Sequence, residues 1–324
     1  MKKLLTTAIA VALTSGAAQA APTVYGAINV GVSSVDAHAA NEDKYELGSY
    51  SSKIGVKGSE DLGNGISGIY KVEIGVDMDG DDNDDLSTYN TIVGLKGQFG
   101  TVFVGKHDTP YKLAGSADLF ANTAADSQKN GTGIIGRGAS KDTGWDNRGS
   151  DVVAYVSPDF GPVHFAAAGV VNEDTGTSPD LFDATSVAAI YKQGNINASA
   201  AYEVNTAYAT DFSAMKVNAS MTHGNIKVGG TYEVSDFYTV SGTTATLAEA
   251  DVTSMLGSVA YTMGDITLMG QYGSVDTATK FTRMTFGASH KLAKSTTLYA
   301  GYNIDDNGSA EDQSTMTMGV NHSF

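Results

Sequence analysis

The sequence predicts an all-β protein, specifically a 16-stranded antiparallel transmembrane β-barrel. Apolar residues alternate with polar or small ones along most of the chain, and no convincing stretch has the 3.6-residue period of a helix. Ile54 and Val56, for example, alternate with Lys53, Gly55 and Lys57. Sixteen such runs are expected as strands, at residues 23–32, 47–57, 65–76, 88–97, 101–107, 149–157, 162–171, 184–193, 195–204, 211–222, 225–235, 251–262, 265–274, 280–291, 296–304 and 314–324.

The connections between these runs alternate between short and long. Short ones such as 97–100 and 223–224 are followed by long ones such as 108–148 and 236–250. Outer-membrane barrels are built with tight periplasmic turns and longer outer loops. All five prolines fall in connections or at strand starts, where a missing N–H breaks no ladder hydrogen bond.

A closed barrel also explains how a chain of mean hydropathy −0.13 can suit a membrane. In a bilayer every backbone N–H and C=O must pair within the protein, which excludes a sheet with open edges. A barrel needs an apolar surface only on its outer face, so apolar residues are required at only every second position of each strand. A soluble β-sandwich or β-helix also alternates and is the alternative fold. The strand number and the connection lengths favour the barrel.

Composition excludes several other classes. Aromatic residues make up 9% and hydrophobic residues 41% of the 324 residues, which is too much for a disordered chain. There is no cysteine, so neither a disulfide scaffold nor a cysteine-ligated metal site can form. The formal net charge of −16 excludes nucleic acid as an expected partner, because no basic patch offsets it.

The first twenty residues have the pattern of a secretory signal peptide. Lys2 and Lys3 precede an apolar stretch, Leu4–Leu13, and the small-residue site Ala18-Gln19-Ala20 follows. We therefore expect a leader at 1–20 and one barrel domain at 21–324. Removal of the two lysines changes the formal charge to −18.

Several motifs resemble the general porins of Gram-negative outer membranes. They are VYGAINVGV at the start of the mature chain, SSKIGVKGSEDLGNGISGIYKVEIG (Ser51–Gly75), IVGLKGQFGTVFVGK (Ile92–Lys106) and RGSDVVAYVSP (Arg148–Pro158). The resemblance implies a homotrimer in the bacterial outer membrane, each subunit a passive water-filled pore for ions and small hydrophilic solutes. It also implies that the long third loop, about residues 108–147, folds into the lumen. It implies no cofactor.

In that family, acidic residues of the third loop face basic residues on the barrel wall, and such charges set ionic selectivity. Motif position assigns Lys53, Lys106 and Arg148 to the wall here. Alternation adds Lys71, Glu73 and Arg283, and the loop supplies Asp118 and Asp126.

Ala154 stands where porins often carry an inward arginine, and lysine twice replaces arginine. The basic wall is therefore expected to be weak. Because the chain is strongly acidic, it should draw cations to its mouth. We expect a weak cation preference.

Two further features carry expectations about partners. The chain ends with Phe324, preceded at alternate positions by His322 and Val320, which is similar to the signal read by the barrel-assembly machinery. The second outer loop is crowded with aspartates, which could bind a divalent ion, bridge to lipopolysaccharide, contact a neighbouring subunit or simply be solvated. These are Asp77, Asp79, Asp81, Asp82, Asp84 and Asp85.

No motif predicts catalysis, and the protein is not expected to be an enzyme. The six histidines are scattered, and neither an H-E-x-x-H nor a G-x-S-x-G motif occurs. An outer-membrane enzyme with a Ser/His/Asp group remains an alternative, for which His107 beside Asp108 is the only local pair. A barrel that displays adhesive loops is a third possibility.

Overall fold

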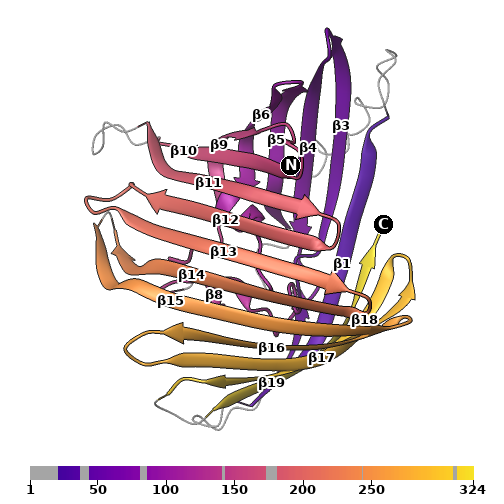
Figure 1. Cartoon of the computed structure of the whole chain (residues 1–324), viewed down its shortest axis with the longest axis vertical. Helices are drawn as coiled ribbons and strands as arrows, with labels where there is room; N and C mark the ends of the chain where they lie inside the picture. The colour runs from indigo at the N-terminus through magenta and orange to yellow at the C-terminus, as the bar shows by residue number, and fades with distance from the viewer. Residues whose placement is uncertain are drawn as a thin grey trace.

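The structure is a computed structural model that describes residues 21–36, 44–80, 86–140, 143–172, 181–242, 244–308 and 312–324. The leader expected at 1–20 lies outside these residues. Most of the chain forms one antiparallel sheet that closes on itself, because the first strand, β1 (Thr23–Asp36), pairs with the last, β19 (Gln313–Ser323). Figure 1 shows the strands following one another around this barrel in chain order.

The barrel wall has sixteen spanning strands, as the sequence predicts. The sheet contains seventeen segments, but β2 (Lys44–Ser49) and β3 (Lys53–Gly63) pair with successive parts of β1 and form one interrupted strand. The interruption contains Ser51, whose φ of 58° departs from extended geometry. The other wall strands are β4 (Ile66–Val76), β5 (Leu86–Gly97), β6 (Gly100–Asp108), β9 (Arg148–Val156), β10 (Val163–Val171), β11 (Phe182–Gln193), β12 (Ile196–Asn205), β13 (Phe212–His223), β14 (Ile226–Ser241), β15 (Thr244–Met263), β16 (Ile266–Asp276), β17 (Phe281–Ala293) and β18 (Thr296–Asp306).

The hairpin of β14 and β15 extends further than predicted and replaces the expected loop at 236–250. The two strands pair as far as Ser241 and Thr244, with register shifts near Phe237. Phe237 and Tyr238 are buried inside the barrel mouth, where they pack with residues of the chain between β6 and β9. This long-range burial stabilises the extension, and a search for period-2 alternation misses it because the register shifts there.

Tight turns join the strands at the opposite end. Gly224 and Gly264 have φ values of 56° and 60°, the left-handed conformation that short hairpin turns require. The remaining elements are helix α2 (Pro110–Leu113) and the short parallel pair β7 (Gln128–Gly131) and β8 (Ile135–Arg137). No helix in the described ranges is long and apolar enough to cross a membrane.

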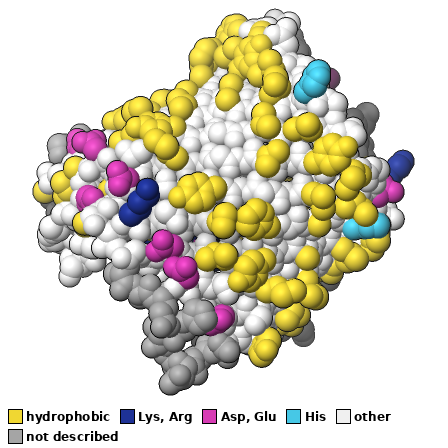
Figure 2. Space-filling view, turned by 60° about the horizontal axis from the view of Figure 1, so that its bottom comes forward, with side chains coloured by type: hydrophobic (Ala, Val, Ile, Leu, Met, Phe, Trp, Pro, Cys, Tyr) yellow, Lys and Arg dark blue, Asp and Glu magenta, His cyan; other side chains and the backbone are white. Residues whose placement is uncertain are grey.

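The outer face of the wall is apolar. Apolar side chains on different strands are about half-exposed or more, for example Val93, Val187, Val259 and Met318. The residues that alternate with them along each strand point inward. Figure 2 shows apolar side chains spread over one side of the barrel and charged side chains near its margins. The two faces of the sheet therefore differ in polarity in the way that the alternation predicts.

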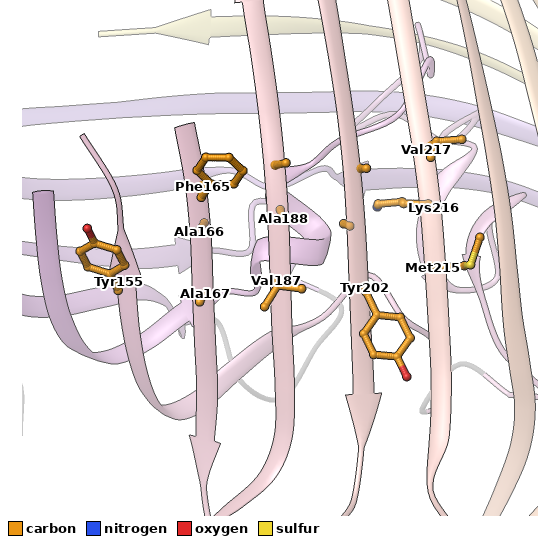
Figure 3. Close-up of a pocket in the computed structure, with 13 residues that line it drawn as sticks. Tyr155, Phe165, Ala166, Ala167, Val187, Ala188, Tyr202, Met215, Lys216 and Val217 are labelled. Atoms are coloured by element: carbon orange, nitrogen blue, oxygen red, sulfur yellow. The ribbon is translucent and has the colours of Figure 1, made fainter. Parts of the chain in front are cut away.

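A shallow apolar hollow of about 570 Å³ lies on the outside of β9–β13. Phe165, Val187, Tyr202 and Met215 project around it, and alanines form its floor (Figure 3). Helix α2 lies behind this part of the wall, where the backbone N–H of Tyr111 donates to Ser186 of β11. The hollow therefore marks the outside of the wall region to which the chain between β6 and β9 is attached.

Candidate functional site in the barrel interior

The chain between β6 and β9 is called here the inner segment, described at residues 109–140 and 143–147. It begins with α2, where Thr109 caps the helix by accepting from the backbone N–H of Lys112 and Pro110 occupies the first turn. Its next turns bond to inward-facing side chains. The pairs are Tyr111 with Ser186 of β11, Ala114 with Ser199 of β12, Ala117 with Thr231 of β14, and Leu119 with Gln271 of β16. The inner segment therefore lies within the barrel, against the wall of β11–β16.

Two apolar clusters fix the inner segment to that wall. In the first, Tyr111, Ala114 and Trp145 of the segment pack with residues of β11–β14; these are Ala188, Ala201, Phe212, Ala214 and Tyr238. In the second, Ile134 and Ile135 pack with residues of β14–β17; these are Phe237, Val252, Leu256, Val275 and Phe281. Burial of this apolar surface stabilises the position of the segment.

A buried charged cluster lies beside the first apolar cluster. Glu233 of β14 accepts from the Tyr111 hydroxyl at 2.7 Å and from the backbone N–H of Gly136 at 2.9 Å. The side chain of Lys216 is fully buried, with its Nζ 3.5 Å from Asp146 and 4.2 Å from the centre of the Tyr111 ring. Charges removed from water in this way are tolerated only when they are paired. The cluster thus ties the start and the end of the inner segment to β13 and β14.

Basic side chains on the opposite wall are paired with one carboxylate. Lys53 of β3 and Lys71 of β4 lie 3.3 Å and 3.8 Å from Glu73. Glu73 is 3% exposed and also accepts from the Tyr25 hydroxyl at 2.8 Å. Two lysines therefore share one counter-charge, and all three predicted wall residues occupy the inward face.

The two predicted arginines are also held by carboxylates. Arg148 donates to Asp108 at 3.0 Å, and the pair lies beside Lys112 of α2. Arg283 forms a two-point contact with Asp305 at 2.6 and 2.7 Å, and donates to the backbone oxygen of Asp126. A two-point arginine–carboxylate contact fixes the guanidinium in one orientation.

The loop aspartates bond mainly within the inner segment. Asp118 accepts from the amide of Gln271 and from the backbone N–H of Phe120 and Ser127. Asp126 accepts from the backbone N–H of Asn122 and Gln128. These carboxylates therefore shape the turn at the tip of the segment as well as carrying charge.

Lys106 lies where the regular alternation of β6 is interrupted. Val102 and Val104, earlier in the same strand, are 40% and 45% exposed on the outside. Lys106 pairs with Thr91 of β5, and Thr91 pairs with Val72 of β4, which faces outward. Gly105, with a φ of 130°, and a register shift between Gly105 and His107 interrupt this alternation, and Asp108, two residues further on, bonds to Asn90 and Arg148 in the interior. The lumen position of Lys106 therefore stays a prediction.

The other predicted residues have mixed positions. At the end of β19 the backbone of Phe324 exchanges two hydrogen bonds with Gly26 of β1, and Val320 lies on the outer face. Asp79 accepts from the backbone N–H of Ser49, while Asp81, Asp82, Asp84 and Asp85 lie outside the described residues. Among the described residues no group of acidic and histidine side chains could hold a metal ion.

The only local pair considered for catalysis has another arrangement. The Nδ1 atom of His107 faces the backbone oxygen of Asp108 at 2.9 Å, and the ring packs on Phe103. The Asp108 carboxylate bonds instead to Asn90 and Arg148. His107 is therefore not oriented by a carboxylate as a general base would be.

Sequence reasoning did not identify the buried cluster of Lys216, Glu233, Tyr111 and Asp146. Alternation does assign Lys216 and Glu233 to the inward faces of β13 and β14. It cannot show that the inner segment covers them, because that contact joins residues as much as 122 positions apart.

Burial and the neighbouring Asp118 carboxylate raise the pKa of Asp126 well above its usual value. Asp126 should therefore take up a proton at a pH where an exposed aspartate is still ionised. Because burial disfavours the ionised carboxylate, it lowers the folding stability only at pH values above the pKa that Asp126 has in the unfolded chain. We expect the cation preference predicted from the sequence to fall on mild acidification, since the tip loses a negative charge. Reversal potentials measured from neutral to acidic pH check this. Asp126→Asn should remove that pH dependence, whereas Asp151→Asn, at an exposed site, should keep it.

Comparison with known proteins identifies clear relatives. A family model described as Gram-negative porin matches residues 6–310. The "Major outer membrane protein P.IB" of Neisseria gonorrhoeae is 41% identical over 123 residues, which are 36% of this chain and 35% of that protein. The "Outer membrane porin protein 32" of Delftia acidovorans is 34% identical over 175 residues, 50% of this chain and 47% of that protein. The matched segments thus span a third to a half of these relatives.

Solved structures share the fold over nearly the whole chain. An anion-selective porin from Comamonas acidovorans has a TM-score of 0.78 at 22% identity and covers 94% of this chain and 99% of its own. The trimer form of OmpT from Vibrio cholerae has a TM-score of 0.66 at 17% identity, covering 94% of this chain and 99% of its own.

Proposed function

The chain belongs to the family of Gram-negative porins, proteins of the outer membrane, and from this premise we propose that it forms a water-filled channel for passive diffusion of ions and small hydrophilic solutes. The observation that carries the proposal is a closed barrel with an apolar outer face and charged, polar side chains on its inner face. Such a wall can contact lipid outside and water inside. The inner segment, fixed to one side of the lumen, would be its constriction.

We further propose that the channel has only a weak preference for cations. The inward-facing cations Lys53, Lys71, Lys112, Arg148 and Arg283 each lie within 4 Å of a carboxylate, so the basic wall is largely neutralised. With little net field at the constriction, the charge of −18 expected after removal of Lys2 and Lys3 from the full chain's −16 is left to favour cations at the mouth. One solved neighbour is described as anion-selective, and its 22% identity carries the fold alone.

We propose a homotrimer as the working assembly, which the trimer form of one structural neighbour supports. We also propose a cleaved leader at 1–20 and contact of the acidic second loop with lipopolysaccharide. We propose further that the barrel-assembly machinery recognises the C-terminal residues Phe324, His322 and Val320. Extraction of the native protein and sizing in mild detergent tests the trimer directly.

Planar-bilayer recording tests the channel and its selectivity together. The mature protein should give large steady conductance steps in groups of three. In a tenfold KCl gradient, roughly 58 mV would mark ideal selectivity, and we expect a much smaller potential with the sign of cation preference. A potential of opposite sign would contradict the cation preference. Silent bilayers from correctly folded protein would contradict the channel itself.

A further inference from the structure

Four glycines on the inward faces of β14–β18 are contacted by side chains of the inner segment. A β-carbon at Gly229 would lie 3.1 Å from Ala117, and one at Gly273 would lie 2.8 Å from Ile134. β-carbons at Gly287 and Gly301 would lie 2.5 Å and 3.3 Å from the ring of Phe120, and the one at Gly287 would also lie 2.3 Å from the backbone oxygen of Ala300. The wall therefore lacks side chains at the places where the inner segment approaches it most closely.

Gly287 and Gly301 together form a socket for Phe120. They are direct cross-strand partners of β17 and β18, so the missing side chains leave one continuous gap on the inner face. The ring of Phe120 fills this gap and is only 3% exposed. We call these two glycines the glycine socket.

The residues around Phe120 form the tip of the inner segment. Asp118 and Leu119 both bond to Gln271 of β16, and Asp126 bonds through its backbone to Arg283 of β17. Ala121 and Asn122, the next residues of the tip, are exposed, and the backbone oxygen of Asn122 accepts from the Asn29 amide of β1 at 2.6 Å. Phe120 is therefore the buried apolar contact next to these exposed residues, beside the hydrogen bonds from Asn29, Gln271 and Arg283.

We propose that Phe120 and the glycine socket hold the tip against β17 and β18 and thereby set the open aperture of the channel. Phe120 is a positioning residue, because it acts on permeation through the tip that it holds. This inference rests on the proposed channel function. The hydrogen bonds of Asp118 and Leu119 fix the shape of the tip, whereas the buried ring supplies most of its apolar attachment.

The first test replaces the ring and then rebuilds the contact from the other side. Phe120→Ala should free the tip to enter the lumen, lowering mean single-channel conductance and raising the time spent closed by about tenfold or more. Gly301→Leu should displace the ring and have the same effect, since the atoms nearest to a β-carbon at position 301 belong to the Phe120 ring. The double variant Phe120→Ala/Gly301→Leu should recover toward the native record, because the new leucine fills the socket.

Gly257→Leu is the matched control. Gly257 lies on the outer face of β15, with nothing within 4 Å of its β-carbon position, so the same substitution there should leave conductance and closing unchanged. Gel mobility of heated and unheated samples establishes that each variant is folded. Native conductance and closing in folded Phe120→Ala would overturn the proposal, as would a double variant no better than either single variant.

A second readout does not depend on conduction. Because the chain has no cysteine, spin labels can be attached at Ala121→Cys on the tip and Met318→Cys on the outer face of β19. With labelled chains diluted in an excess of unlabelled chains, pulsed electron paramagnetic resonance should give one narrow distance within the subunit in the native background and a broader, shifted distribution with Phe120→Ala. An unchanged distribution would overturn the proposal. If even the native channel is silent while the distances respond, the channel function fails and the attachment of the tip stands.

Discussion

Replacement of Glu73 by glutamine should shift the ion selectivity of the channel toward anions by about three- to tenfold in permeability ratio. Glu73 is the shared counter-charge of Lys53 and Lys71, at 3.3 Å and 3.8 Å. Glutamine keeps the shape and can still accept from the Tyr25 hydroxyl, but it leaves two lumen lysines without their carboxylate. Reversal potentials in a KCl gradient measure the shift.

The control for this experiment is Glu60→Gln. Glu60 is an exposed residue near the end of β3, so the substitution removes the same charge away from the inner segment. Equal shifts in the two variants would mean that overall charge alone sets selectivity. A larger shift in Glu73→Gln would mean that the paired lysines act locally, as expected.

Replacement of Lys216 by methionine should destabilise the folded barrel by about 3–5 kcal/mol, the range typical of removing one partner from a buried ion pair. Methionine fills a similar volume, but it removes the buried cation that lies 3.5 Å from Asp146 and that interacts with the buried Glu233; Asp146 keeps Lys112 at 3.6 Å. The loss should appear as a lower temperature at which the folded band disappears on gels and as a lower denaturant midpoint in detergent.

Lys192→Met is the matched control, because Lys192 is exposed near the end of β11 and should tolerate the change within about 0.5 kcal/mol. If Lys216→Met is as stable as this control, the cluster does not depend on its cation. A partial rescue of Lys216→Met at acidic pH is expected, since protonation of the remaining carboxylates would remove their unpaired charge.

The number of spanning strands, the outward apolar face and the inward positions of Lys53, Lys71 and Glu73 could all be predicted from the sequence. Each follows from the two-residue period of a strand, which is a local property. Lys106 was assigned to the lumen from its motif, and because Gly105 interrupts the alternation of β6 beside it, its position stays a prediction. The extended hairpin of β14 and β15 was missed because a register shift breaks the period.

The sequence by itself thus determined a closed barrel with two unlike faces, because a membrane and backbone hydrogen bonding leave an alternating chain few other choices. Only the tertiary structure decided which carboxylate each lumen cation faces, which charges become buried, and that Phe120 enters the gap at Gly287 and Gly301. Those contacts join segments more than a hundred residues apart in several cases. These segments come together when the sheet closes into a ring and the inner segment folds across the interior. No local pattern in the sequence predicts which residues then meet.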